Sequence, residues 1–384
     1  MAAGGGGTED PAAAAASPNL TSRGRRESSW REGGKERRGR TDQPRQCYKS
    51  ENEFMEEKAV IRKQRSLFPE IVTQTQHNSL CSTWGNFHYK TFDGAIYRFP
   101  GICNYLFATQ CGKHFEDFNI QIQQEWVNKL PSISHMSLKL NEVLIEVNDH
   151  VPTIDGKRVI LPYNDNGIRI DKTNTTLKIS VKLMLDLTWE DGNSIHLTLN
   201  KKYMGETCGL CGNYNGKADD DITYDGVEID PLIFGQLQVL RKPGETCEDP
   251  KPDLGKKCNI YRARCLKQLR SSKWAKCNRL VKPNLYIEAY MMDMCLCKSN
   301  EKLSTFCLCT TVAEYSRQCA LAGGKPPEWR SPTMCYKPCP ANLVYSECSP
   351  PCAPTCSNPG TYYFCDGPCV AGCVCPKGKF FSLS

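Results

Sequence analysis

The sequence predicts a mainly β chain: an antiparallel β-sandwich, then a small disulfide-rich helical module and a cysteine-rich tail, preceded by a disordered N-terminal leader. Between Cys81 and Cys247 apolar residues alternate with polar ones, as in strands that are buried on one face. Six of the 24 cysteines precede Cys247, and the other eighteen lie from Cys247 to Cys375, in one third of the chain. Cysteines at that density indicate disulfides formed in an oxidising compartment.

Residues 1–66 are polar, basic and rich in Gly and Ala, so they cannot bury enough apolar surface to fold. A tail that binds polyanions and a solvated disordered leader are the two alternatives, and the scarcity of aromatic residues for base stacking favours the leader. Residues 1–46 lack the basic start and apolar centre of a secretory signal peptide. We therefore expect a fragment, or an alternative start, of a secreted protein.

The clearest alternation places an apolar residue at every odd position from Leu177 to Trp189. Shorter alternating runs begin at Met136 and Ile195. Dipeptides that favour hairpin turns separate these runs. They are Asn148-Asp149, Asp155-Gly156, Asn166-Gly167 and Asp191-Gly192.

After Cys247 the apolar spacing becomes helical, first from Cys258 to Leu269 and again from Val312 to Cys319, before a stop at Gly323-Gly324. From Cys339 onward Cys, Pro and Gly dominate, and cross-links must replace a core that is too small to hold its shape alone. The tail is therefore a cross-linked module.

Three stretches carry a resemblance to a known family. Residues 81–94 read Cys-Ser-Thr-Trp-Gly-Asn-Phe-His-Tyr-Lys-Thr-Phe-Asp-Gly, residues 208–216 read Cys-Gly-Leu-Cys-Gly-Asn-Tyr-Asn-Gly, and residues 309–319 read Cys-Thr-Thr-Val-Ala-Glu-Tyr-Ser-Arg-Gln-Cys. In order and spacing they resemble the D assembly of gel-forming mucins, von Willebrand factor and otogelin-type proteins, with the first D assembly of a gel-forming mucin the closest. The resemblance implies a von Willebrand type D domain at 79–248, a C8 module at 256–335 and a trypsin-inhibitor-like (TIL) module at 339–384, which breaks off at Ser384.

The loop from Asn213 to Asp221 alternates short Asn and Asp side chains around a Gly, which suits a Ca²⁺ ion that needs six to eight oxygen ligands. From the residues alone, a calcium loop and a solvated acidic turn are equally good interpretations. The family resemblance implies a calcium site. Its implied ligands are the side chains of Asp93, Asn213, Asn215, Asp220 and Asp221 and the backbone carbonyl of Lys217.

The spacing of Cys208 and Cys211 matches that of redox-active pairs, so disulfide exchange is one interpretation of this motif. The resemblance implies structural bonds instead. The implied pairs are Cys81–Cys211, Cys103–Cys247 and Cys111–Cys208. Each would close a long loop and, in the chain-entropy model, stabilise the fold by roughly 4 kcal/mol.

Where the mucin pattern has a cysteine five residues before Cys295, this chain has Tyr290, so one cysteine of the helical module lacks its usual partner. Cys297 and Cys307 are the candidates for a free or intermolecular thiol, and a reshuffling of local pairs is the alternative. Asn174 begins an N-glycosylation sequon in a polar turn. His88, within the first motif, is either a pH sensor or a hydrogen-bonded structural residue.

The sequence contains no nucleophile elbow, metal-binding helix or phosphate loop, so we expect a structural protein and not an enzyme. The predicted function is that of a secreted, calcium-binding, disulfide-stabilised module in the assembly of mucin-like or matrix polymers. Self-association or binding to other D-assembly proteins follows from the resemblance. We expect no nucleic-acid partner and no membrane span. Disulfide exchange, and protease inhibition by the TIL module, are the alternatives.

Overall fold

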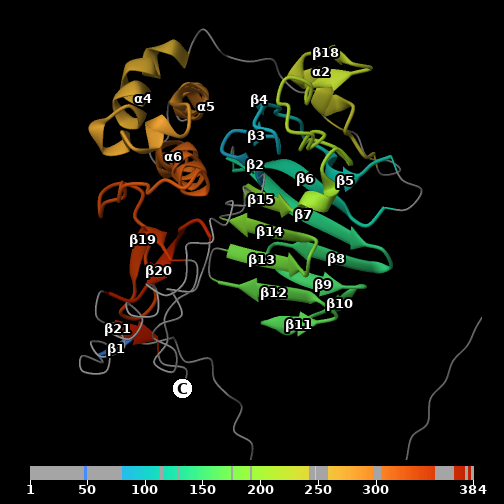
Figure 1. Ribbon diagram of the computed structural model, residues 1–384, viewed down its shortest axis with the longest axis horizontal. Coiled ribbons are helices and arrows are strands. Elements are labelled where there is room, and N and C mark those ends of the chain that lie inside the picture. Colours follow the sequence, from blue (N-terminus) through green and yellow to red (C-terminus); the bar gives the residue numbers. More distant parts are fainter. Residues whose placement is uncertain are drawn as a thin grey trace, which may run out of the picture. The chain divides into compact units, whose positions relative to one another are not determined.

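The computed structural model describes residues 47–49, 80–112, 116–128, 130–173, 176–190, 193–241, 247, 258–296, 304–350, 367–376 and 379–381 (Figure 1). All of them lie in one compact unit, Pro44–Ser384. No described helix combines the length and the apolar composition that crossing a membrane requires.

The first part of this unit consists of two antiparallel sheets that share one hydrophobic core. One sheet has seven strands in the order β10 (Lys157–Arg158), β9 (Val151–Ile154), β8 (Val143–Asn148), β7 (Leu130–Leu140), β6 (Asn119–Val127), β5 (Asn104–Gln110) and β16 (Thr207–Cys208). The other has eight in the order β11 (Tyr163–Asp165), β12 (Ile168–Lys172), β13 (Thr176–Val181), β14 (Leu185–Glu190), β15 (Ser194–Leu199), β2 (Leu80–Trp84), β3 (His88–Lys90) and β4 (Ile96–Arg98). The predicted fold class is confirmed.

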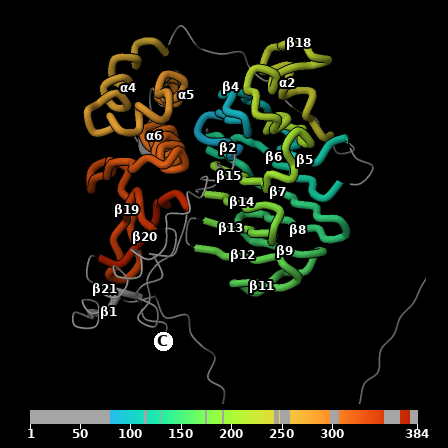
Figure 2. Tube along the Cα trace, viewed as in Figure 1, coloured from blue at the N-terminus to red at the C-terminus, as the bar shows by residue number. Residues whose placement is uncertain are grey.

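Most neighbours in each sheet are joined by short turns, as the trace in Figure 2 shows for β7 to β9. Three of the predicted turn dipeptides, at 148–149, 155–156 and 166–167, lie at such hairpins. The turns at 155–156 and 166–167 place an Asp or Asn and then a Gly at positive φ. Asn, Asp and Gly adopt that conformation most readily, so these turns direct the chain back on itself. The fourth dipeptide, 191–192, lies outside the described residues.

The long alternating run is two strands and not one. β13 ends at Val181 and β14 begins at Leu185, and Leu183 between them is 75% exposed with a φ of 59°. The alternation continues across this hairpin turn by coincidence, so periodicity alone does not reveal the break.

Short elements follow the sheets: η1 (Lys201–Tyr203), the hairpin of β17 (Thr223–Tyr224) and β18 (Val227–Glu228), and α2 (Pro231–Gln236). The helical module comprises η2 (Asn259–Tyr261), α4 (Arg262–Leu269), η3 (Ser272–Trp274), η4 (Cys277–Arg279), α5 (Pro283–Leu296) and α6 (Ser304–Leu321). The first stretch predicted to be helical, from Cys258 to Leu269, forms η2 and α4, and α6 contains the second. α5 is apolar on nearly every side, with eight buried residues, and has no amphipathic periodicity that would predict it.

The cysteine-rich tail contributes β19 (Val344–Ser349), β20 (Val370–Val374) and β21 (Lys379–Phe381). β21 pairs antiparallel with β1 (Cys47–Lys49), the one described segment of the predicted disordered leader. These three leader residues therefore form a strand, because the unpaired edge of β21 offers hydrogen-bonding groups to any extended segment within reach.

Trp84, at the end of β2, belongs to the core of the helical module and not to the core between the sheets. Its side chain is 1% exposed, its ring stacks on Tyr286 with centroids 6.1 Å apart, and its Nε1 donates to Thr311 Oγ1 at 3.0 Å. We call the part of the chain that forms the two sheets the β domain. It therefore shares a buried, hydrogen-bonded aromatic contact with the helical module.

We predict that Trp84→Ala lowers the free energy of unfolding by about 3–5 kcal/mol, because it leaves a cavity in the core of the helical module. Thermal unfolding followed by near-UV circular dichroism, with the disulfides intact, measures the change. The matched control is Trp126→Ala, since Trp126 is 41% exposed. Equal effects of the two substitutions would contradict the role assigned to Trp84.

Candidate functional site

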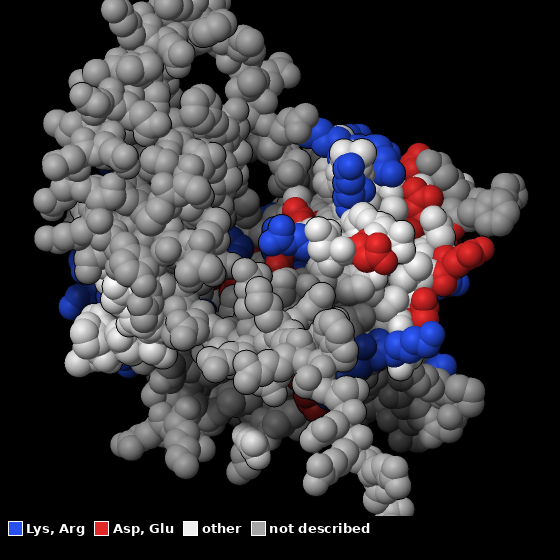
Figure 3. Space-filling view, turned by 90° about the horizontal axis from the view of Figure 1, so that it is seen from below, with Lys and Arg blue, Asp and Glu red and all other residues white. Residues whose placement is uncertain are grey.

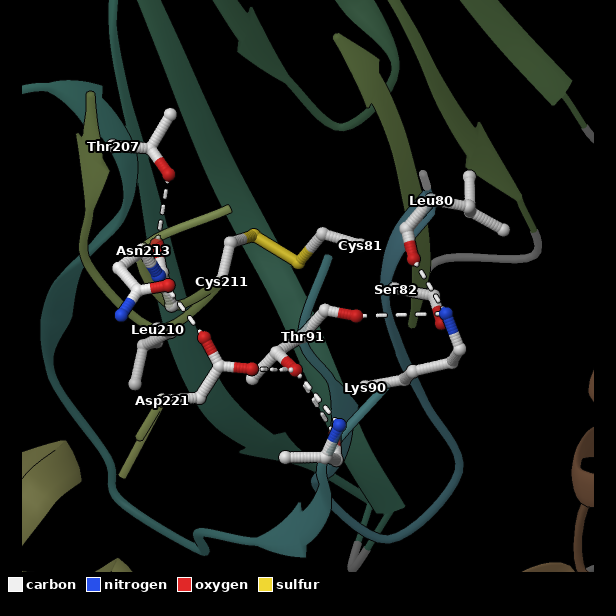
Figure 4. The surroundings of a disulfide bond; sticks show 12 residues. Leu80, Cys81, Ser82, Lys90, Thr91, Thr207, Leu210, Cys211, Asn213 and Asp221 are labelled. Carbon is white, nitrogen blue, oxygen red and sulfur yellow. Dashed lines mark hydrogen bonds between the residues drawn. A yellow bond between two sulfur atoms is a disulfide. The ribbon is translucent and has the colours of Figure 1, made fainter. Parts of the chain in front are cut away.

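The predicted calcium loop follows β16 and folds back onto the β domain. Asp221 is 4% exposed, and its carboxylate accepts hydrogen bonds from Thr91 Oγ1 at 2.6 Å and from the backbone N–H of Asn213 at 3.1 Å (Figure 4). Gly212 has a φ of 77°, and a Cβ at this position would clash with the Asp221 carboxylate. A glycine is therefore required for the loop to approach Asp221.

Two further carboxylates bind the same loop. Asp93 accepts from the backbone N–H groups of Asn215 at 2.8 Å and Gly216 at 2.9 Å. Asp220 accepts from the side-chain Nδ2 atoms of Asn213 and Asn215, each at 2.8 Å. The structure thus gathers Asp93, Asp220 and Asp221 around the two asparagines, although Asp93 lies more than a hundred residues away in sequence.

The electrostatics of this cluster favour a cation. The pKa of Asp221 is raised to about 6, chiefly by burial; the hydrogen bonds from Thr91 and Asn213 oppose this shift, and the charges of Asp93 and Asp220 support it. Burial also raises the pKa of Asp93, and Asp220 adds to that shift. The three carboxylates are close enough to repel one another, and a divalent cation would relieve that repulsion.

The donor set fits calcium better than a transition metal. Its donor atoms are all oxygens, which calcium prefers. Within the described residues no group of three His, Cys, Asp or Glu side chains has the geometry to hold a metal ion, so the three carboxylates do not form a site by themselves. Calcium also accepts amide and backbone carbonyl oxygens, which the loop offers through Asn213, Asn215 and Lys217. In the structure the amide nitrogens of the asparagines face Asp220, and their Oδ1 atoms accept from the backbone N–H groups of Asn215 and Lys217. A half-turn of an amide would present its oxygen in place of the nitrogen, with the loss of that backbone hydrogen bond.

Two disulfides hold the base of the loop. Cys211 is bonded to Cys81 of β2, as Figure 4 shows, and Cys208 of β16 is bonded to Cys111. A third bond joins Cys103 to Cys247. These are the three pairs that the family resemblance implies.

The bonding of the Cys-Gly-Leu-Cys motif bears on the disulfide-exchange alternative. Exchange chemistry at such a motif needs its two cysteines to alternate between free thiols and a bond to each other. Here each is bonded to a distant cysteine, and Cys211 is fully buried. The structure therefore contradicts an exchange centre at Cys208 and Cys211.

Within the described residues the one cysteine of the helical module that forms no disulfide is Cys265, which sequence reasoning did not identify. Cys307 is disulfide-bonded, so its prediction as a free thiol is wrong, and Cys297 lies outside the described residues. Cys265 is buried in the same core as Tyr290, the residue that stands where the mucin pattern has a cysteine. Burial raises the pKa of the Cys265 thiol to about 12, and the charge of Asp293 adds to the shift.

Three cysteines of the helical and C-terminal modules that lie two positions from another cysteine form disulfides with distant partners. They are Cys295, Cys309 and Cys373. The bonds in these modules are Cys258–Cys295, Cys277–Cys319, Cys309–Cys335, Cys339–Cys373 and Cys348–Cys369.

A second set of polar residues, which the sequence did not predict, joins the β domain to the helical module. His88 is 2% exposed, and its Nε2 lies 2.9 Å from Oδ1 of Asp293, a fully buried carboxylate on α5. Asp293 also accepts from Thr311 Oγ1 at 2.5 Å and from the backbone N–H of Asn86 at 3.0 Å. A carboxylate within the run Met291-Met-Asp-Met294 is the one sequence signal for this contact, because a buried charge requires partners.

A second group of hydrogen bonds between the same two modules centres on Glu314 of α6. Its carboxylate is 1% exposed and accepts from Ser82 Oγ at 2.7 Å and Arg317 Nη1 at 3.1 Å, with Nε2 of His196 at 3.0 Å. Arg317 also donates to Glu190 Oε2 at 2.8 Å. Burial raises the pKa of both carboxyls, but His196 and Arg317 outweigh it, so the pKa of Glu190 is about 2 and that of Glu314 is well below its usual range.

Asn174, the predicted glycosylation site, lies outside the described residues, between β12 and β13. The segment 351–366 of the C-terminal module lies outside them as well, so protease inhibition by this module stays an untested alternative.

Family models match three regions of the chain. The von Willebrand factor type D domain matches residues 81–226, the C8 domain residues 264–336, and the trypsin inhibitor-like cysteine-rich domain residues 339–383. They follow one another in the order that the sequence motifs indicate. None of the three is the model of an enzyme family.

Several curated proteins are similar to this chain. Human Mucin-5AC is 41% identical over 304 residues, which cover 79% of this chain and 5% of that protein. Human Mucin-2 is 36% identical over 313 residues, with coverages of 80% and 6%. Chicken Mucin-5B is 36% identical over 320 residues, with coverages of 80% and 15%. The chain therefore spans a small part of the length of these relatives.

We predict that Tyr290→Cys creates a disulfide between Cys265 and the new thiol. The bond would close a loop of about 25 residues and contribute about 3 kcal/mol, which roughly offsets the packing that the buried Tyr290 ring loses. Peptide mapping by mass spectrometry under non-reducing conditions is therefore a better measure than thermal stability. In the parent chain, Cys265 should resist iodoacetamide at pH 8 until the protein is unfolded. Rapid labelling of native Cys265, or a free thiol at 290 in the variant, would contradict the assignment.

We predict a loss of stability in acid that depends on Glu190. Its folded pKa of about 2 lies below its ordinary value of 4.5, so its contribution is present above pH 4.5 and disappears as the pH falls toward 2. Glu190→Gln should lower the free energy of unfolding at pH 6 by about 2 kcal/mol, and the difference from the parent chain should shrink below pH 4.5. Thermal unfolding between pH 6 and pH 2.5 measures both.

The control for this titration is Glu142→Gln, which neutralises an exposed carboxylate of the same domain. It should leave the pH dependence of the parent chain unchanged. A difference between Glu190→Gln and the parent that stays constant from pH 6 to pH 2.5 would rule out the ion pair with Arg317 as its source.

Proposed function

We propose that this chain is an extracellular polymer-assembly module that binds Ca²⁺ in its D domain, because three of its regions match the von Willebrand factor type D, C8 and TIL domain models. The single observation that carries the calcium proposal is the convergence of Asp93, Asp220 and Asp221 on the loop of Asn213 and Asn215. The similarity to mucins supports the assembly role.

The proposed ligands are the side chains of Asp93, Asn213, Asn215, Asp220 and Asp221 with the carbonyl of Lys217. When bound, the ion would neutralise charge and cross-link the loop to the segment that carries Asp93. Two contacts within the protein position the loop for the ion: Thr91 donates to one Asp221 oxygen, and the Cys81–Cys211 bond holds the base of the loop. The cation then acts as a structural bridge.

The disulfide content supports an extracellular location. Among the cysteines whose side chains the structure describes, all except Cys265 form disulfides. Such bonds persist in oxidising compartments. We propose as partners further copies of this chain or other proteins with D assemblies. The Glu314 and Trp84 contacts support the role, because they hold the D domain and the C8 module in one arrangement for docking.

We predict that CaCl₂ at a hundred times its dissociation constant raises the free energy of unfolding by about 2.7 kcal/mol, since the ion binds the folded loop alone. Asp220→Asn should abolish most of this gain, whereas Asp225→Asn, an exposed residue in the next turn, should keep it. Isothermal titration calorimetry with Ca²⁺ and thermal unfolding with and without chelator measure the two quantities. A gain that is equal in both variants would place the ion elsewhere.

Assembly is tested separately by light scattering after gel filtration of the full chain, in calcium and in chelator. Multimers that dissociate in chelator, and that Asp220→Asn also lacks, are the expected result. A monomer under every condition would refute the assembly role while leaving the calcium measurement intact.

A further inference from the structure

The segment of the C8 module from α4 to the start of α5 carries a dense set of exposed positive charges. Between positions 262 and 282 eight residues are basic and none is acidic, and all eight are exposed. No Asp or Glu occurs anywhere from 254 to 287. We call these eight residues the basic row. They are Arg262, Arg264, Lys267, Arg270, Lys273, Lys276, Arg279 and Lys282.

The spacing aligns these charges along the surface. From Arg264 onward every third residue is basic. Side chains three residues apart are neighbours on an α-helix such as α4 and eclipse one another in 3-10 turns such as η3 and η4. In the second part of the row, Trp274 and Cys277 occupy the buried side. Lys273, Lys276 and Arg279 therefore share the exposed side.

The basic row has no neutralising partners within the described structure. Elsewhere basic residues pair with carboxylates, as Arg169 does with Asp171 at 2.6 Å, and Figure 3 shows acidic and basic residues close together on the surface of one face. In the basic row the one side-chain hydrogen bond joins Arg270 to the amide of Asn284 at 2.5 Å, and no described carboxylate forms an ion pair with any member. These charges repel one another and attract counter-ions, so an anionic polymer that displaces the counter-ions gains free energy.

We propose that the basic row is a binding surface for a linear sulfated polysaccharide. Repeated charges with no deep pocket suit a flexible polyanion that is bound through many ion pairs. Three observations favour this partner over others: two concern the side chains near the basic row, and one concerns the compartment.

Single-stranded nucleic acids need exposed aromatic rings for base stacking. Of the aromatic residues of this region, Trp274, Tyr286 and Tyr290 are buried, and Tyr261 is partly buried against the C8 core. Insertion into an anionic membrane needs an amphipathic helix with an apolar face turned outward, but on α4 Cys265 and Leu269 are buried and Leu266 is partly buried in the C8 core. The exposed apolar residues nearby, Ile260 in η2 and Leu280 after η4, lie in separate 3-10 turns and form no helical face. The disulfides place the folded chain outside the reducing cytosol, where sulfated polysaccharides are the abundant linear polyanions.

The test uses heparin as the probe and the full chain, in chelator so that the outcome does not depend on the calcium site. Lys273→Glu/Lys276→Glu/Arg279→Glu reverses the centre of the basic row. Lys157→Glu/Arg158→Glu/Lys182→Glu makes the same change of charge at exposed positions of the D domain. Residues 1–66 are identical in both variants, so any binding by their basic residues cancels in the comparison.

We expect the C8 variant to bind heparin at least about 30-fold more weakly at 0.15 M NaCl than the D-domain variant, and its plot of log affinity against log salt to be shallower by about three. Surface plasmon resonance measures the affinities, and near-UV circular dichroism confirms that both variants are folded. Lys273→Ala/Lys276→Ala/Arg279→Ala should show a smaller loss in the same direction.

Two results would overturn the proposal. Equal losses in the C8 and D-domain variants would assign binding to net charge and not to the basic row. Binding of poly(dT), or of phosphatidylserine vesicles, as tight as that of heparin and equally sensitive to the C8 variant would assign the surface to another class of partner.

Discussion

A carboxylate that folding removes from water must recover its lost hydration through hydrogen bonds and opposite charges. Glu314 meets this requirement through Ser82 and His196 of the D domain as well as through Arg317 of its own helix. The neighbouring residue on α6 that faces the TIL module, Ser316, donates to the buried carboxylate of Glu347 at 2.9 Å. One helix thus presents polar groups to two modules. If either neighbour moved away, a charged or polar group would lose its partner, and this penalty fixes the arrangement of all three.

Disulfides act within the modules of this molecule, whereas packing and hydrogen bonds act between them. The described disulfides of the D domain, the C8 module and the TIL module each close a loop within one module. The links between modules are packing and hydrogen bonds, namely Trp84 in the C8 core and the bonds of Asp293 and Glu314. The sulfur bridges therefore stabilise each module individually, whereas the position of one module against the next depends on desolvated polar contacts, which respond to pH and to substitution.

The sequence predicts those features that depend on near neighbours. Alternation of apolar residues located the sheets, and Asn-Gly or Asp-Gly dipeptides located two hairpins, since both effects act over a few residues. Parity indicated a cysteine without its partner but not which one, because pairing depends on which sulfur atoms lie within reach after folding. The contact between the modules joins residues more than two hundred positions apart, such as Ser82 and Glu314, and no local pattern encodes it. The resemblance supplied the calcium ligands, since spacing alone does not distinguish a metal loop from an acidic turn.

The same separation of constraints indicates how the D domain would respond to a cation. The disulfide at Cys211, the Gly212 turn and the bond from Thr91 to Asp221 fix the backbone of the loop without any metal. The groups that remain to be rearranged are the amides of Asn213 and Asn215, which now donate to Asp220. Turning two side chains costs far less conformational entropy than ordering a loop. Little of the free energy of ion binding is therefore needed to order the loop. Binding would then change the charge and stiffness of this surface while the fold stays the same, as suits a module whose shape must be set before it meets its partners.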